Sequence, residues 1–247
     1  MRTNKLALVV PAALALTFIA GCGTGTGDAG ADQGKKAAAS ATPSVASNGV
    51  DELAAAEIMS RARKATAGAP SVRLTGRFKE GGDDLGLDFR FAGRKKAAGT
   101  VQMGNQHIKL TRIGSTVYFK GNDAFLRSIG DKNAVTLMSG KYVKTTSKDP
   151  DFAEIASFSN LSGLLGELLS AKGSDWDKGK AGTVAGKPTV TLSGPDGEQV
   201  HVATQGQPYL LQIDAGPQGS LDFVSYGEPV AVEAPPANTV LDLGSMQ

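Results

Sequence analysis

The segment 71–120 alternates apolar and polar residues in short runs that are separated by turn-forming residues. The runs are Ser71–Glu80, Leu85–Ala92, Ala97–Met103, Gln106–Arg112 and Ser115–Lys120. A period of two places alternate side chains on opposite faces of a strand. Such runs with short connections predict an antiparallel meander with one apolar face and one solvated, charged face. The apolar face therefore needs a cover from another part of the chain.

Helical patterns elsewhere in the chain are suited to this cover. Four helical segments are predicted: 50–67 with Asn48 as its N-cap, 122–130, 133–139 and 149–171. The last has the clearest pattern, because its leucines follow the helical spacing i, i+3, i+4, i+7 and i+8: Leu161, Leu164, Leu165, Leu168 and Leu169. These leucines form one apolar stripe that can pack on the sheet.

Further strand patterns follow the meander. They lie at 141–146, 180–184, 188–192, 199–204, 209–213 and 221–226. The closing segment 230–243 contains Ala234-Pro235-Pro236, which favours an extended edge segment over a central strand. About ten strands and four helical segments predict a single α+β domain that spans residues 50–247.

The first 22 residues have the pattern of an export signal. Arg2 and Lys5 precede an apolar run, 6–20, that is too short to span a bilayer stably. The run ends in Ile19-Ala20-Gly21-Cys22, which resembles a bacterial lipobox. This resemblance implies a signal peptide over 1–21, cleavage between Gly21 and Cys22, and a lipid on the Cys22 thiol. A plain signal peptide with an incidental cysteine, or an N-terminal membrane anchor, is the alternative.

Residues 22–49 are predicted to join the lipidated cysteine to the domain as a flexible linker. Gly, Ala, Ser and Thr dominate 23–49, and no aromatic residue occurs there. Such a chain has a root-mean-square span of roughly 26–31 Å, and fully stretched it reaches on the order of 90 Å. The predicted location is the extracytoplasmic face of the cell membrane, with a lipid anchor.

The charge balance gives no sign of a nucleic-acid partner. The full chain has 26 basic and 24 acidic residues, and the predicted signal peptide holds two of the basic residues and no acid. The remaining chain is therefore formally neutral. Because nucleic-acid binding needs a clustered basic surface, and none is visible in the sequence, we expect no DNA or RNA partner.

Few residues of this chain suit catalysis or metal binding. Its histidines, His107 and His201, fall in separate strand patterns, and Cys22 is the single cysteine. A zinc site would need both histidines and carboxylates from distant strands, and the sequence has no Gly-x-Ser-x-Gly elbow. The acid pairs all fall in turns: Asp83/Asp84, Asp149/Asp151 and Asp175/Asp177. We therefore expect no enzyme, no metal site and no cofactor.

Several motifs resemble the LppX/LprA/LprF/LprG lipoproteins of actinobacteria over residues 50–243. They are Tyr118-Phe119-Lys120-Gly121, the strand Lys141–Lys144, the leucine-rich helix pair, Pro208–Leu211, Asp222–Tyr226 and the closing Ala234–Leu243. The resemblance implies a LolA/LolB-like fold, in which a strongly curved antiparallel sheet forms an unclosed half-barrel around helices and an apolar cavity. One departure is Tyr142, where the family often has tryptophan, so the shape of the pocket is left open.

The apolar face of the meander has two interpretations. The alternation of apolar residues by itself favours a filled core. The resemblance instead favours a cavity that binds an acyl-chain lipid, glycolipid or lipoglycan for transport or presentation. The alternative function is a membrane-tethered protein-interaction or regulatory module without a lipid ligand. The residues predicted to line the cavity are Leu74, Phe78, Leu87, Phe89, Phe91, Val101, Met103, Ile108, Leu110, Leu164 and Leu168. Besides the lipid, the expected partners are the membrane, through acylated Cys22, and an envelope protein.

Overall fold

The computed structural model describes residues 46–80, 82–170 and 176–242. The predicted signal peptide, its cleavage site at Gly21 and Cys22, and the linker up to residue 45 lie outside the described residues and stay predictions. None of the described helices is long and apolar enough to cross a membrane.

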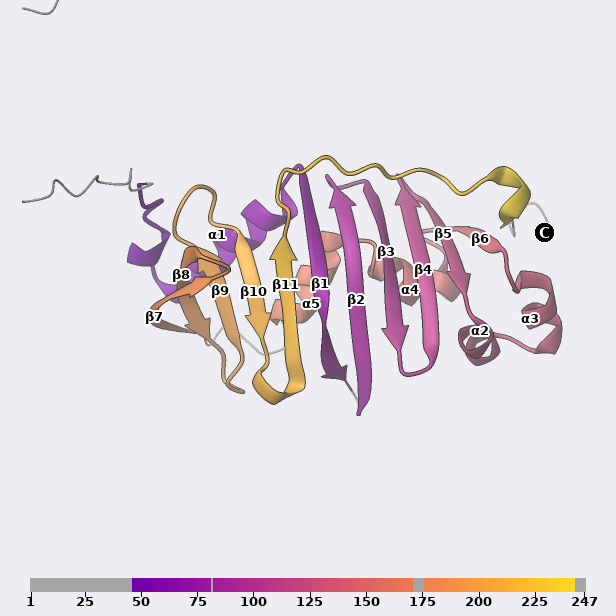
Figure 1. The fold of residues 1–247 in the computed structure, drawn as a ribbon, viewed down its shortest axis with the longest axis horizontal. Helices are drawn as coiled ribbons and strands as arrows, with labels where there is room; N and C mark the ends of the chain where they lie inside the picture. The colour runs from indigo at the N-terminus through magenta and orange to yellow at the C-terminus, as the bar shows by residue number, and fades with distance from the viewer. Residues whose placement is uncertain (1–45, 81, 171–175, 243–247) are drawn as a thin grey trace, which may run out of the picture. The chain divides into compact units, whose positions relative to one another are not determined.

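The described strands form one sheet of twelve in the order β12-β6-β5-β4-β3-β2-β1-β11-β10-β9-β8-β7, open at both edges (Figure 1). Neighbouring strands are antiparallel except β12 and β6, which run parallel. The sheet thus has more than the ten or so strands expected. The strands are β1 (Ser71–Glu80), β2 (Asp83–Ala92), β3 (Lys96–Met103), β4 (Gln106–Ile113), β5 (Thr116–Gly121), β6 (Tyr142–Thr146), β7 (Asp177–Val184), β8 (Lys187–Ser193), β9 (Gln199–Ala203), β10 (Leu210–Asp214), β11 (Gly219–Val224) and β12 (Val240–Asp242).

The meander predicted over 71–120 is confirmed as β1 to β5. In β2 the alternation is clear, because Leu85, Leu87, Phe89 and Phe91 are buried while the residues between them are not. The pairing of β1 with β11 joins this meander to the strands of the second half, and it places Leu74 opposite Phe223. The α+β class with an unclosed, almost wholly antiparallel sheet agrees with the expectation.

The helical segments of the described residues are short. They are η1 (Val50–Glu52), α1 (Ala55–Ala67), α2 (Asp123–Ile129), α3 (Lys132–Met138), η2 (Pro150–Phe152), α4 (Ala153–Ser157), α5 (Leu161–Ser170), η3 (Gly216–Gln218) and η4 (Ala237–Thr239). The predicted segment 149–171 is therefore divided among η2, α4 and α5. Asp149 caps η2 by accepting a hydrogen bond from the Asp151 amide (3.1 Å).

The predicted N-cap of the first helix is wrong, because α1 begins at Ala55 and Asn48 does not cap it. The Asn48 side chain instead donates to the backbone oxygens of Ala203 and Gly206, both at 3.1 Å. Ser47 also forms an isolated bridge with Gln205. Ser47 and Asn48, which belong to the segment assigned to the linker, thus contact the segment 203–206 of the domain.

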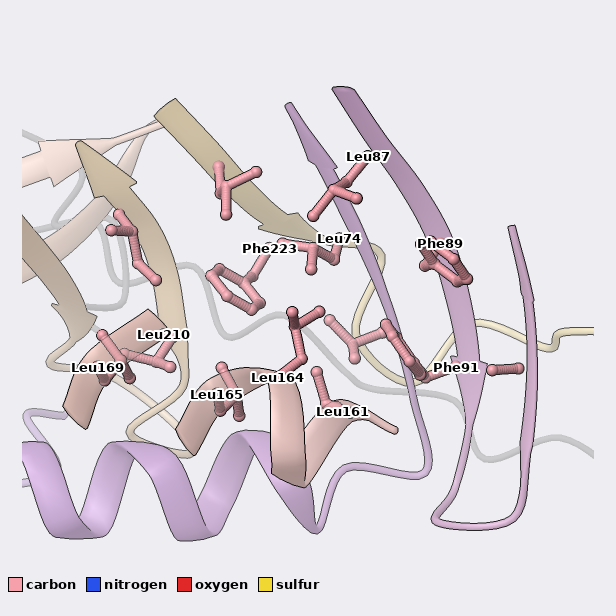
Figure 2. Packing of buried hydrophobic residues seen from close by; sticks show 14 of the residues in the cluster. Leu74, Leu87, Phe89, Phe91, Leu161, Leu164, Leu165, Leu169, Leu210 and Phe223 are labelled. Atoms are coloured by element: carbon pink, nitrogen blue, oxygen red, sulfur yellow. The ribbon is translucent and has the colours of Figure 1, made fainter. Parts of the chain in front are cut away.

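Helices α1, α4 and α5 cover one face of the sheet (Figure 1). Figure 2 shows the leucines of α5 facing Leu74, Leu210 and Phe223, three fully buried residues on β1, β10 and β11. At the β4–β6 end, Phe125 of α2 packs edge-on against Phe119 with ring centroids 6.1 Å apart. A large part of the apolar face is therefore a filled core.

Candidate functional site

A cavity of about 720 Å³ lies between α4 and α5 on one side and the sheet on the other. Small-molecule sites in proteins commonly measure about 300–1,000 Å³. Four of the sheet residues at the cavity lie within two residues of a strand end: Phe78 near the end of β1, Leu85 near the start of β2, Ile213 near the end of β10 and Leu221 near the start of β11. The cavity therefore lies beside the β1–β2 and β10–β11 turns, where these four neighbouring strands end.

Most of the cavity wall is apolar. The sheet contributes Phe78, Leu85, Leu87, Met103, Ile213 and Leu221, and the helical side contributes Ala153, Phe158, Leu164 and Leu168. Trp176, the only tryptophan of the chain, also lines the cavity and is 9% exposed. Because apolar side chains from two layers leave a space between them, the site suits a hydrocarbon group.

The eleven residues predicted to line a cavity divide into two groups. Five line it: Phe78, Leu87, Met103, Leu164 and Leu168. The other six are buried in the packed core away from it: Leu74, Phe89, Phe91, Val101, Ile108 and Leu110. All eleven belong to the same apolar side, but a period of two does not reveal which of them a helix covers tightly. Whether any of them contacts a lipid stays a prediction.

Several residues that line the cavity were not predicted from the sequence. Leu85 and Leu221 are buried and lie in strands that the sequence predicted, but the strand patterns did not place them at the cavity. Ile213 and Phe158 reach the cavity only because β10 and α4 are brought to the same end of the sheet. These residues share a position close to a turn, where a strand or helix ends.

Charged side chains are also present at the cavity. Lys79, Asp83, Glu154 and Glu167 are exposed lining residues. Glu198 lines it as a buried residue, and its Oε2 accepts a hydrogen bond from the Asp196 amide (3.1 Å). The apolar cavity therefore opens to solvent through a polar rim.

The two histidines do not meet. His107 is exposed on β4 and His201 lies on β9, and five strands separate β4 from β9 in the sheet. The His201 Nδ1 lies 3.2 Å from the Thr191 hydroxyl, and burial lowers the pKa of His201. Among the described residues no group of three or more His, Cys, Asp or Glu side chains could hold a metal ion.

The small residues of the sheet serve close strand packing. A Cβ at Gly76 would collide with the backbone oxygen of Ser220 on β11, and one at Gly99 would collide with the Asp88 oxygen and the Phe89 ring. At Gly86 a Cβ would meet its nearest neighbours at 3.6 Å, which is ordinary contact. Gly76 and Gly99 therefore let neighbouring strands approach each other and do not line the cavity.

Two of the sequence motifs meet away from the cavity. Tyr226 donates a hydrogen bond from its hydroxyl to the Leu210 oxygen (2.6 Å), and the Leu210 amide donates to the Thr66 hydroxyl of α1 (3.0 Å). Tyr142, where the resembled family often has tryptophan, lies on β6, and the Lys120 Nζ is 5.7 Å from its ring centroid. Tyr142 does not line the cavity. These motifs therefore hold elements together.

Comparison with solved structures finds a similarity to LprF from Mycobacterium bovis, with 16% identity and a TM-score of 0.42, over 73% of this chain and 96% of that one. A second match is a domain described as an outer membrane lipoprotein-sorting protein, from Vibrio parahaemolyticus, with 10% identity and a TM-score of 0.24 over 73% and 95% of the two chains. No family model and no curated protein matches this chain. At these TM-scores, function has to be argued from the cavity itself.

Proposed function

We propose that this chain is a cell-envelope lipoprotein that holds the acyl part of a lipid, glycolipid or lipoglycan in the cavity, for transport or presentation. The supporting observation is the apolar space of about 720 Å³ between α4–α5 and the sheet. Each buried methylene contributes about 0.8 kcal/mol. Ten methylenes would thus give roughly 8 kcal/mol, on the order of micromolar affinity before ordering costs.

The proposed anchor is a lipid on Cys22, which would hold the protein on the extracytoplasmic face of the membrane. Its support is the position of the only cysteine directly after the apolar run 6–20 and Gly21. A single acyl chain binds a membrane only marginally, whereas two or three chains bind it stably. A diacylated or triacylated Cys22 would therefore confine lipid transfer to the neighbourhood of the membrane.

The test uses the segment Pro43–Gln247, which forms a compact unit and contains every residue of the buried cluster. The purified segment is analysed by native mass spectrometry and then extracted with organic solvent. We expect a bound species that carries an acyl chain. Extracts without any acyl species, together with no uptake of added fatty acid or monoacylglycerol, would overturn the proposal.

A variant that fills the cavity makes this test specific. Leu168 is partly buried at the cavity, so Leu168→Trp should occupy the space and reduce the amount of bound acyl species. The matched control is Leu137→Trp on α3, where the side chain is 40% exposed and far from the cavity lining. Equal lipid content in both variants would count against binding in this cavity.

The alternative of a tethered interaction module has one observation in its favour. Ile129 of α2 and Leu137 of α3, each 40% exposed, are the large apolar side chains most exposed among the described residues. A protein partner lost on Ile129→Asp or Leu137→Asp, in a chain without acyl ligand, would support that alternative.

A further inference from the structure

The charged side chains at the cavity mouth are mostly acidic. Asp83 at the start of β2 lies on the sheet side, and Glu154 of α4 and Glu167 of α5 lie on the helical side. Lys79 is the single basic side chain among the described lining residues. Carboxylates thus reach the mouth from both walls, and they outnumber the basic group before the buried Glu198 is considered.

No ion pair among the described residues neutralises these charges. The ion pairs of the described residues join Glu57 with Arg61, Arg73 with Asp88, and Lys144 with Asp242. None of them includes Lys79, Asp83, Glu154 or Glu167. The described residues at the mouth therefore have a net formal negative charge at neutral pH.

A ligand whose tail occupies the apolar wall has its polar head at this mouth. Two like charges repel each other most strongly where nearby protein lowers the dielectric constant, and like charges placed together discriminate against wrong partners. Sites built for phosphate or carboxylate groups use arginine, lysine or backbone amides instead. Carboxylates, by contrast, accept hydrogen bonds from hydroxyl groups and attract cations.

We propose that this cavity selects acyl ligands with an uncharged or cationic head and disfavours those with an anionic head. The inference rests on the proposed function, because it concerns the head of the ligand whose tail the cavity holds.

The test compares three probes with the same myristoyl tail on Pro43–Gln247: cationic myristoylcholine, neutral monomyristoylglycerol and anionic myristoyl-lysophosphatidylglycerol. Trp176 fluorescence reports binding, since Trp176 lines the cavity and is the only tryptophan, and native mass spectrometry confirms each complex. We expect the anionic probe to bind about tenfold more weakly than the neutral one at low salt. In about 1 M salt, where the Debye length is about 3 Å, the two affinities should approach each other.

Charge variants locate the effect. Glu154→Gln combined with Glu167→Gln should reduce the preference for the neutral over the anionic probe by about threefold or more. The matched control is Glu233→Gln, an exposed acid outside the cavity lining, which should leave the preference unchanged. Lys79→Gln should increase the preference, because it removes the basic group at the mouth.

The outcomes separate the two proposals. If none of the three probes binds by either readout, the proposed function fails and this inference fails with it. If all three bind equally at low salt, or the anionic probe binds best, the cavity holds acyl chains but the charge selection is wrong. A preference that the Glu233→Gln control changes as much as the double variant would also overturn the selection at the mouth.

Discussion

The rings of Tyr209 and Tyr226 stack in parallel, with centroids 4.0 Å apart and planes at 5°. Tyr209 precedes β10, and Tyr226 follows β11. The Tyr226 hydroxyl donates to the Leu210 oxygen and lies 3.4 Å from the Thr66 hydroxyl of α1. This pair of residues thus connects the helical cover to the sheet at a point remote from the cavity.

Tyr226→Phe keeps the ring and removes the hydroxyl, so it should destabilise the fold by about 1–3 kcal/mol, because a buried carbonyl loses its donor. Urea unfolding followed by circular dichroism measures the change. The matched control is Tyr118→Phe on β5, whose hydroxyl has no hydrogen bond among the described residues; it should change the free energy of unfolding far less. Equal losses in both variants would contradict the role of the hydroxyl.

The same hydroxyl predicts an alkaline effect. Burial raises the pKa of Tyr226 above that of an unfolded tyrosine. The folded state then keeps the proton that the unfolded state releases, so stability is fully present below about pH 10 and falls as the pH rises further. The free energy of unfolding should fall less between pH 8 and pH 11 in Tyr226→Phe than in the unchanged protein.

Arg73 and Asp88 form a two-pronged ion pair across β1 and β2, with Nε–Oδ1 at 2.9 Å and Nη2–Oδ2 at 2.7 Å. The hydrogen bond from Arg73 lowers the pKa of Asp88. The ion pair therefore stabilises the folded state above the unfolded pKa of aspartate, about 3.9. This stabilisation is lost as the pH falls through the lower pKa of the folded state. Because both side chains are about one-third exposed, Asp88→Asn should cost at most about 1 kcal/mol at pH 7. The difference between the two proteins in urea unfolding should shrink as the pH falls below about 3.9.

Gly76 and Gly86 provide a paired test of strand packing. Gly76→Ala should destabilise the fold by about 2 kcal/mol or more, because the new Cβ collides with the backbone of β11. Gly86→Ala has room and should be neutral or stabilising by about 0.4–1 kcal/mol, since it restricts the unfolded chain. Thermal unfolding of the two variants measures the contrast, and similar melting temperatures would contradict it.

Leu110 and Leu168 separate core from cavity. Leu110 is fully buried in the core, so Leu110→Ala should cost about 2–5 kcal/mol. Leu168 is only partly buried at the cavity, so Leu168→Ala should cost less stability but weaken acyl-ligand binding. Unfolding and probe titration on both variants make the comparison. A large stability loss and unchanged binding for Leu168→Ala would indicate a purely structural residue.

The anchor is tested in cells. Cys22→Ser should release the protein from the membrane fraction, because no thiol remains to carry a lipid, while the extracted acyl ligand should stay the same. Fractionation followed by lipid extraction measures both. Continued membrane association would favour the alternative of an N-terminal membrane anchor, and loss of bound ligand would mean that the anchor and the cavity are coupled.

Sequence periodicity was enough to predict much of the local structure of this protein. The alternation over 71–120 predicted β1 to β5, and the leucine spacing predicted α5, because both depend on which residues lie a few positions apart. Both patterns also indicated which apolar side chains face inward. Leu87 and Leu110 both occupy inward-facing positions of the strand alternation.

The difference between Leu87, which lines the cavity, and Leu110, which is packed in the core, arises from the three-dimensional arrangement of the elements. That difference depends on the pairing of β1 with β11 and on where α4 and α5 lie over the sheet. The same holds for the acidic mouth, which combines Asp83 with Glu154 and Glu167 from distant parts of the chain. Contacts between residues far apart in sequence leave no periodic signal, so the fold had to bring these side chains together before the cavity became visible.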